Sequence, residues 1–507
     1  MITALKILSP FKMSRPISLG KESPSRSRIM YRLARGAFWS MVGGIASRAL
    51  TMGSGIIVAR LLGKEGYGEI GMIQSTIGMF GVFAGFGLGA TATKYIAEFR
   101  TKDPARAGRI ANLTILISLI IGGLMAIMCL GMSGWLAEKT LNRADLSSLL
   151  AAGALLLLVS TLGGVLLAAL AGFEAFREIA RINILQGVAA PLITIPLVFL
   201  FGIDGAVASM TINAGIGLYL CVIAVRREYA KFGMSYRFDH TAWNEWPVLS
   251  KFALPSMLSG LMVAPVIWVT NTILANQPGG YGELGLFNAA NQWRMAVIFL
   301  PGLLTSAMLP VLSETHGRED RTEFVDAVIL NLRATWIIAL PLTVFIVTMN
   351  KPLAALFGKQ FEGTASIISV LMISVFLNVV NGAVGTALAG SGRMWTGAFM
   401  NLGWALILVG SSLVLIPLLG GLGLAVAYLI SYLVHTIWVM AYVELRLARF
   451  SISKQWQLIL FSLLLLMASV GLAGVHFKQF AYHIVLVGLS LLPLIKTVRA
   501  KFPAVVR

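Results

Sequence analysis

The chain has 507 residues, of which 57% are hydrophobic and 12% charged, and its mean hydropathy is +0.84. Soluble domains carry about 25% charged residues, so this composition excludes a soluble globular protein and indicates many membrane spans. A net charge of +19 would suggest nucleic-acid binding in a soluble protein, but here the cations flank apolar segments, where topology and anionic lipid explain them. The two cysteines, Cys129 and Cys221, lie within apolar spans and predict neither a disulfide framework nor a metal site.

The N-terminal segment 1–35 is basic and rich in Ser and Pro. It has no apolar core long enough for a cleavable signal, so we interpret it as a basic cytosolic tail that ends in an interfacial helix at 30–35. Beyond it, hydropathy predicts an all-α, polytopic membrane protein with about 14 transmembrane helices. The predicted spans are 36–59, 70–93, 110–136, 148–171, 179–201, 205–225, 252–275, 285–312, 328–349, 364–389, 395–417, 422–443, 457–475 and 480–495.

The connections between these spans differ in charge. Alternate connections, beginning with the tail, carry clusters of Lys and Arg, for example at 94–109, 226–251 and 496–507. The opposite connections carry only Arg60, Lys64, Lys139, Arg143, Lys351, Lys359 and Lys478. Because cytoplasmic loops hold the excess of Lys and Arg, this asymmetry predicts that both termini lie in the cytoplasm.

The sequence also repeats itself. GYGEIGM at 66–72 returns as GYGELGL at 280–286, and LAALAG at 167–172 returns as GTALAG at 385–390. Asn183 is matched by Asn401, and GIDGAVA at 202–208 by GLGLAVA at 421–427. Each repeat holds six spans, so both halves share one orientation, as in transporters with parallel repeats. The predicted parts are an N-terminal six-helix lobe at 36–225, a cytosolic linker at 226–251, a C-terminal six-helix lobe at 252–445 and two extra helices at 457–496.

Two arginines, Arg48 and Arg294, lie deep within predicted spans, with no carboxylate at comparable depth. A charge at the bilayer centre costs at least roughly 2.5–3.5 kcal/mol, so it usually faces a wet cavity. A rise of 1.5 Å per residue puts Arg48 about 18 Å from the inner face and Arg294 about 14 Å from the outer face of a ~30 Å core. Both then lie near one level. Since a guanidinium matches phosphate oxygens, the pair suggests an anion site; snorkelling or helix pinning is the alternative.

Polar side chains accompany both arginines. Ser47 and Thr51 lie beside Arg48, whereas Asn288 and Asn291 share one helix face with Arg294 at a spacing of three residues. The repeat partner of Asn288 is Gln74. These groups are suited to sugar hydroxyls, and Trp39, Trp268 and Trp293 to stacking on sugar rings, although interhelical packing explains them equally well. His435 fits a structural hydrogen bond better than a proton relay.

Three segments together resemble the polysaccharide-biosynthesis (O-antigen/exopolysaccharide) flippases of the multidrug/oligosaccharidyl-lipid/polysaccharide exporter superfamily. They are VARLLGKEGYGEIGMIQSTIGMFGVFAGFGLGATATKYIAEF at 58–99, LFGKQFEGTASIISVL at 356–371 and LIPLLGGLGLAVAYLISYL at 415–433. The resemblance implies two lobes that open alternately to each side of the bacterial cytoplasmic (inner) membrane and a polyprenyl-pyrophosphate-linked oligosaccharide as substrate. In the related lipid II flippases, cavity arginines on the first and eighth helices bear on the pyrophosphate, and Arg48 and Arg294 occupy those helices here.

The sequence departs from its relatives in one respect. Many carry an Asp where Gly85 stands and another near Thr270 and Asn271, so cation coupling through those carboxylates is not expected here. A multidrug/cation antiporter of the same superfamily should hold an intramembrane Asp or Glu, which the predicted spans lack. That antiporter and a lipid II-type peptidoglycan precursor flippase are the alternatives.

The expected partners follow from this interpretation. They are the lipid-linked glycan, the lipid bilayer and polysaccharide polymerase or ligase machinery, with no nucleic acid. The predicted outward loops are too short to hold an enzyme's catalytic face, so we expect no catalytic residue, no metal and no cofactor. The expected state is a monomer.

Overall fold

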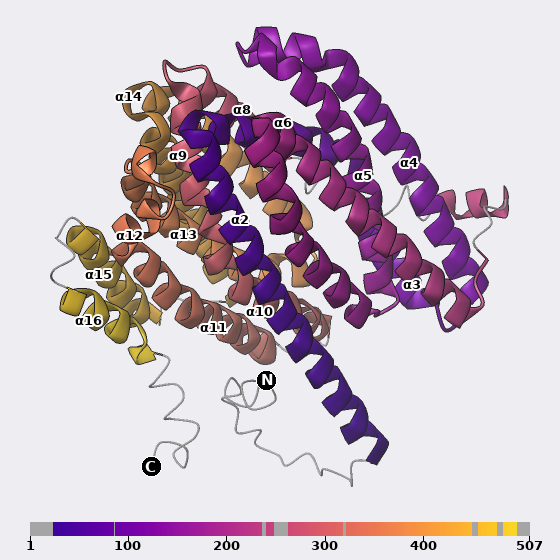
Figure 1. The fold of residues 1–507 in the computed structure, drawn as a ribbon. Helices are drawn as coiled ribbons and strands as arrows, with labels where there is room; N and C mark the ends of the chain where they lie inside the picture. The colour runs from indigo at the N-terminus through magenta and orange to yellow at the C-terminus, as the bar shows by residue number, and fades with distance from the viewer. Residues whose placement is uncertain are drawn as a thin grey trace. The chain divides into compact units, whose positions relative to one another are not determined.

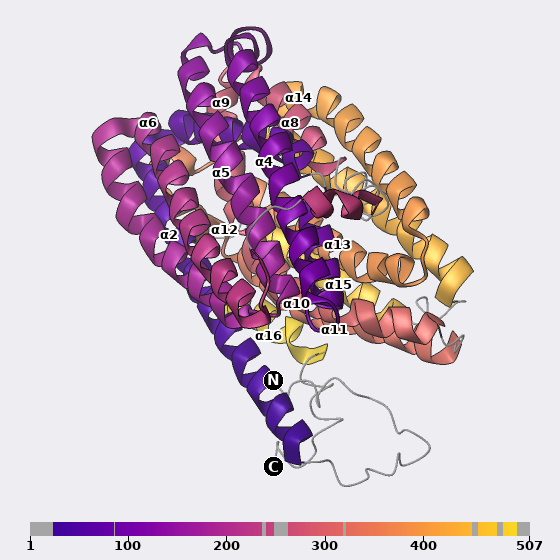
Figure 2. The same cartoon turned by 90° about the vertical axis from the view of Figure 1, so that its right-hand side faces the viewer.

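A computed structural model describes residues 24–85, 87–235, 240–247, 262–317, 321–448, 455–473 and 480–493 (Figures 1 and 2). Every regular element in these ranges is a helix, which confirms the all-α class. Most of the predicted tail (1–23) and the linker residues 236–239 and 248–251 lie outside the described residues. From Pro24 onward the tail is helical and continues into the first span, so the helix is longer than its apolar segment.

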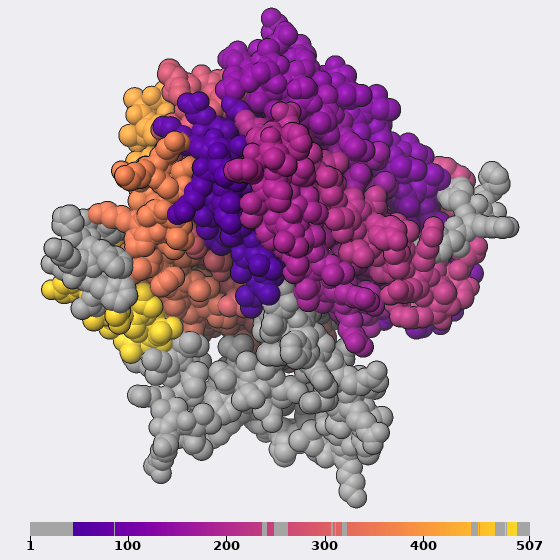
Figure 3. Space-filling model, viewed as in Figure 1, coloured from indigo at the N-terminus to yellow at the C-terminus, as the bar shows by residue number. Residues whose placement is uncertain are grey.

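Contacts divide the chain into two compact units, of which the first runs from Leu19 to Gly285. Its helices are α2 (Pro24–Gly85), α3 (Leu88–Phe99), α4 (Pro104–Trp135), α5 (Ser147–Gly172), α6 (Phe176–Phe232) and α8 (Val263–Ala275). Short helical turns cover Leu136–Thr140, Ala144–Leu146 and His240–Glu245. The helices α2 and α6 lie side by side and form much of the surface seen in Figure 3.

The second unit begins at Leu286, inside α9 (Gly280–Gln292). It continues with α10 (Arg294–Gly317), α11 (Arg321–Thr348), α12 (Asn350–Ala355), α13 (Thr364–Gly390), α14 (Met394–Val443), α15 (Trp456–Ala473) and α16 (Phe480–Ser490). This contact boundary differs from the linker at which the repeat divides the sequence. The lobes at 36–225 and 252–445 therefore remain a prediction.

Glycines divide the three longest helices. Gly63 in α2, Gly202 in α6 and Gly420 in α14 have φ values of 70°, 58° and 58°. Positive φ is strained for residues with a Cβ, so glycine joins two consecutive helices at each point. Seven helical stretches among the described residues are long and apolar enough to cross a membrane, and three of them contain such a glycine. The total of fourteen spans and their two-lobe layout remain predictions.

The local geometry at these glycines repeats with the sequence. Gly202 has ψ −130° and Gly420 has ψ −132°, and the two residues lie 218 positions apart. A Cβ on Gly205 would lie 1.9 Å from the Leu197 carbonyl oxygen, and one on Gly423 would lie 2.1 Å from that of Leu415, again 218 positions on. The turns that follow α5 and α13 repeat likewise, with bonds of 2.9 Å from Ala175 N to Leu170 O and from Arg393 N to Leu388 O.

This spacing corrects one detail of the sequence comparison. The shared Ala-Val-Ala letters pair the segments 202–208 and 421–427 at a spacing of 219 residues. The backbone pairs Gly202 with Gly420 instead, because both residues occupy the same positive-φ corner. The match was therefore one residue out of register, whereas Asn183 with Asn401 keeps the spacing of 218.

Close packing at Gly205 leads to a stability prediction. Gly205→Ala would drive a Cβ into the Leu197 carbonyl, and overpacking of this kind costs about 1–3 kcal/mol. We expect a lower melting temperature of the purified protein and less protein in the membrane. Gly215→Ala is the matched control, because a Cβ at Gly215 of the same helix meets no atom within 4 Å. Equal stability of the two variants would contradict the close contact between Gly205 and the Leu197 carbonyl.

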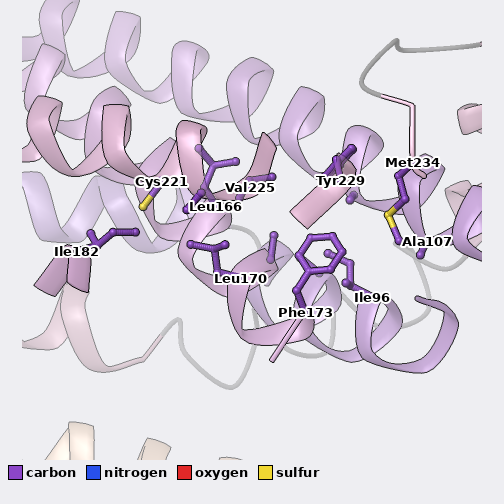
Figure 4. Packing of buried hydrophobic residues seen from close by; sticks show 14 residues of the cluster. Ile96, Ala107, Leu166, Leu170, Phe173, Ile182, Cys221, Val225, Tyr229 and Met234 are labelled. Atoms are coloured by element: carbon purple, nitrogen blue, oxygen red, sulfur yellow. The ribbon is translucent and has the colours of Figure 1, made fainter. Parts of the chain in front are cut away.

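The first unit has an apolar core between α3, α4, α5 and α6 (Figure 4). Phe173, at the end of α5, packs edge-on against Tyr229 of α6 with ring centroids 5.9 Å apart. Other members of the cluster include Ile96, Leu166, Leu170, Ile182, Cys221 and Val225. In contrast, the side of α4 that faces away from this core exposes Leu119, Ile120, Leu124, Ile127 and Met128, with exposed fractions of 45–69%. An apolar exterior of this kind is typical of a helix that faces lipid.

Candidate functional site

The hydroxyl groups near Arg48 are used in helix packing. Ser47 Oγ donates to the Asn183 carbonyl of α6 at 2.8 Å, and a Cβ on Gly187 would lie 2.1 Å from that same Oγ. Thr51 Oγ1 donates to the Ser47 carbonyl at 2.9 Å. Ser47 thus lies at a close crossing of α2 and α6, which favours the packing interpretation for both residues.

Arg48 lies off this crossing. One residue along a helix is a rotation of about 100°, so the side chain after Ser47 points away from the crossing. The Arg48 side chain is exposed in the first unit. It is therefore placed where a ligand in a cavity, or lipid, can reach it.

Polar side chains of α2 also form hydrogen bonds with α8. Trp268 Nε1 donates to Thr76 Oγ1, and Asn271 Nδ2 donates to Ser75 Oγ, both at 3.1 Å. These bonds favour interhelical packing for Trp268 over sugar stacking. Gln74 on the same stretch is exposed, and its Nε2 lies 3.4 Å from Met210 Sδ. Since sulfur is a weak acceptor, Gln74 keeps most of its capacity to bind a ligand.

In the second unit, the helix is interrupted beside Arg294. Regular α-helix ends at Gln292 and resumes at Arg294, and Ala296 N donates to the Trp293 carbonyl at 3.1 Å. The side chains of Asn288, Asn291 and Arg294 are half-buried. Among the described residues, Asn288 Nδ2 and Trp293 Nε1 have no hydrogen-bond acceptor.

This arrangement offers donors of hydrogen bonds and positive charge. The Arg294 guanidinium supplies the charge and donors, and the turn at Trp293 is bridged by backbone bonds from Trp293 N to Ala290 O at 3.2 Å and from Ala296 N to Trp293 O at 3.1 Å. Two side-chain donors without acceptors lie within six residues of that cation. The region around Arg294 is therefore chemically suited to a phosphate-like anion.

His435 has the partner expected of a structural residue. Its Nδ1 lies 3.2 Å from Asn381 Nδ2, and both side chains are buried between α13 and α14. The pair thus joins two helices of the second unit. No group of three or more His, Cys, Asp or Glu within the described ranges could hold a metal ion.

A polar cluster that was not predicted from the sequence lies at the helix ends assigned to the non-cytoplasmic side. Glu69, the acidic residue of the first GYGE motif, is 5% exposed and forms an ion pair with Arg143. The Arg143 guanidinium also pairs with Asp145 at 2.7 Å and lies 5.1 Å from the centroid of the Tyr281 ring. The hydrogen bond to Asp145 raises the pKa of Arg143 above its usual value.

The same cluster ties two loops together. Asn142 Nδ2 donates to Asn276 Oδ1 at 2.9 Å, and Asn276 Nδ2 donates to the Thr140 carbonyl at 2.9 Å. The Tyr281 hydroxyl donates to the Leu141 carbonyl at 2.9 Å. We name residues 140–143 with Glu69, Asn276 and Tyr281 the outer cluster. The repeated GYGE letters were the available signal, but they did not show that Glu69 is buried.

Comparison with known proteins decides the family. The model of a family described as polysaccharide biosynthesis protein matches residues 33–316, more than half of the chain. The chain belongs to this family. The membership confirms the resemblance drawn from the three segments and agrees with a polytopic membrane transporter.

Two known proteins align with most of the chain. It is 24% identical over 380 residues to the EPS I polysaccharide export inner membrane protein EpsE of Ralstonia solanacearum, covering 73% of this chain and 83% of that protein. It is 23% identical over 416 residues to the lipid III flippase of Escherichia coli (strain K12), covering 80% and 96%.

Solved structures share the fold. The lipid II flippase MurJ in an inward closed conformation has a TM-score of 0.65 and 15% identity, covering 92% of this chain and 99% of that one. An inward-facing multidrug resistance MATE family transporter of the MOP superfamily has a TM-score of 0.64 and 18% identity, covering 78% and 94%. The fold of this family member is thus that of MOP-superfamily transporters.

Proposed function

We propose that the protein is a flippase that moves polyprenyl-pyrophosphate-linked oligosaccharide from the inner to the outer leaflet of the bacterial cytoplasmic membrane by alternating access. The observation that carries this proposal is the turn beside Arg294, where a cation and two side-chain donors without acceptors occur together. Family membership and the printed names of the relatives support a lipid-linked glycan as the substrate class.

In this mechanism the pyrophosphate binds Arg294, with Asn288, Asn291 and Trp293 as neighbouring donors. A guanidinium presents a planar fork to phosphate oxygens and stays charged when desolvated. Arg48 is the second cation, and Gln74 supplies an amide for the sugar. Ser47 and Thr51 support these groups through the α2–α6 crossing, since their donors already bond to carbonyls.

The polyprenyl tail is too long and apolar to enter a polar cavity, so it stays in the bilayer while the headgroup crosses. We propose six helices in each lobe, two extra helices at the C-terminal end, and both termini in the cytoplasm. The transporter works as a monomer and delivers its product to polymerase or ligase machinery outside.

A deletion strain tests this function. Without the protein, lipid-linked oligosaccharide should accumulate on the cytoplasmic side while surface glycan is lost, and re-expression should restore it. Accumulation of lipid II instead would favour the peptidoglycan-precursor flippase, and drug sensitivity without a glycan defect would favour the antiporter.

A prediction about energy coupling follows from the absence of acidic side chains in the predicted spans. We expect transport to continue when only the sodium or proton gradient is collapsed at constant membrane potential. His435→Gln should retain transport, because Gln can still hydrogen-bond to Asn381 across α13 and α14. Transport rates in vesicles with imposed ion gradients measure this, and loss of transport with either gradient alone would contradict it.

A further inference from the structure

The segment between the two repeats contains a short 3₁₀-helix, His240–Glu245. A 3₁₀-helix has three residues per turn, so side chains three positions apart lie on one side. Ala242 and Glu245 form one side, with exposed fractions of 1% and 6%, and Trp243 and Trp246 form another, with 44% and 49%. The two tryptophan rings are 6.3 Å apart, between centroids.

The buried side of this segment is fixed to α4. Glu245 forms ion pairs with Arg106 Nε at 3.1 Å and with Arg109 at 3.4 Å. Ala242 belongs to the same buried apolar cluster as Leu113 and Ile117. From Arg109 to Ile117 the helix rises about 12 Å, so the segment spans the level where the charged start of α4 gives way to its apolar part.

The level of this segment identifies what its exposed side meets. Beyond Ile117, α4 exposes a continuous row of large apolar side chains that begins at Leu119 and Ile120. Such a row faces acyl chains, and Trp is enriched where acyl chains meet headgroups. Two arginines against one glutamate also leave a net positive charge near the lipid phosphates.

We propose that Trp243 and Trp246 insert into the boundary between headgroups and acyl chains of the leaflet in which α4 begins. The excess of Lys and Arg in the connection before α4 assigns this leaflet to the cytosolic side. The occupant of this surface is membrane phospholipid. The ion pairs of Glu245 transmit this anchorage to α4, so the segment between the two repeats is fixed at one end to both the bilayer and the first unit. The inference does not depend on the substrate.

Site-directed spin labelling of the full chain in liposomes tests the proposal. Labels are placed singly at Trp243→Cys and Trp246→Cys, with Lys102→Cys as the water reference and Leu124→Cys as the bilayer reference, since both reference side chains are exposed. The native cysteines are both buried and are replaced by Ala. Power saturation then compares collisions with oxygen and with a water-soluble nickel chelate.

We expect labels at 243 and 246 to collide more with oxygen than with the chelate, at a depth between the two references. Asn244→Cys keeps both tryptophans and is also exposed, so its label reports the depth of the segment even where the tryptophan variants fail to fold. Chelate accessibility equal to that of Lys102→Cys at these positions would overturn the proposal. So would low accessibility to both reagents, because protein rather than lipid would then cover the surface.

Discussion

Arg294→Ala is expected to abolish export of the surface glycan while the protein still inserts in the membrane. Removing one partner of a desolvated, hydrogen-bonded charge pair costs about 2–5 kcal/mol, which corresponds to a loss of roughly 30-fold to several thousand-fold in binding. Arg48→Ala should have the same direction of effect. Arg294→Lys should also fail, because Lys keeps the charge but loses the planar fork of donors.

The controls separate recognition from folding. Arg60→Ala removes an exposed arginine outside the proposed site and should leave export unchanged. Trp293→Phe keeps the ring but removes the Nε1 donor, and loss of one hydrogen bond of about 0.5–1.5 kcal/mol predicts a decrease of roughly 2- to 12-fold. Surface glycan at wild-type levels in both alanine variants, with normal protein amounts, would rule out an arginine-based pyrophosphate site.

Crosslinking the outer cluster is expected to stop turnover. The loop 276–279 leads into α9, and α9 leads to Arg294, while Asn142 and Glu69 lie in connections between predicted spans of the N-terminal lobe. If substrate leaves between these segments, the contact between Asn142 and Asn276 must part in each cycle. We therefore expect Asn142→Cys with Asn276→Cys, joined by a short reducible bis-thiosulfonate linker, to block export, and reduction to restore it.

Two controls show whether the crosslink itself, rather than the cysteine substitutions or the reagent, blocks export. Each single cysteine variant treated with the same reagent should export normally, since Asn142 and Asn276 are both exposed and contribute no buried charge. The double variant without the linker should also export normally, because no crosslink then joins the two loops. Full export with the 142–276 crosslink complete would show that the outward exit lies elsewhere.

Much of the fold could be read from the sequence, because hydrophobic runs and local glycine geometry are properties of neighbouring residues. Gly202 and Gly420, 218 residues apart, form the same positive-φ corner in each repeat. Asn183 and Asn401 have the same spacing, so this register was visible in the sequence. The all-α class and the family followed from the same local patterns.

The site was harder to predict, because it depends on which helices meet. Ser47 and Trp268 are polar residues within spans, and only the crossings with α6 and α2 show that their donors are occupied. Glu69 looked like part of a repeated motif, but its partner Arg143 lies 74 residues away, a pairing that periodicity cannot reveal. The interruption at Trp293 has no proline or glycine as a signal at that position.

Reconstitution with defined lipids is the most direct test of the central claim. The purified protein would be placed in liposomes that carry a fluorescent polyprenyl-pyrophosphate oligosaccharide, and lipid that reaches the opposite leaflet would be counted by its access to an added enzyme or quencher. We predict that wild-type protein moves this lipid across the bilayer, that Arg294→Ala does not, and that the polyprenyl monophosphate without sugar is not moved. Equal rates in protein-free liposomes and in liposomes with wild-type protein would contradict the proposed flippase.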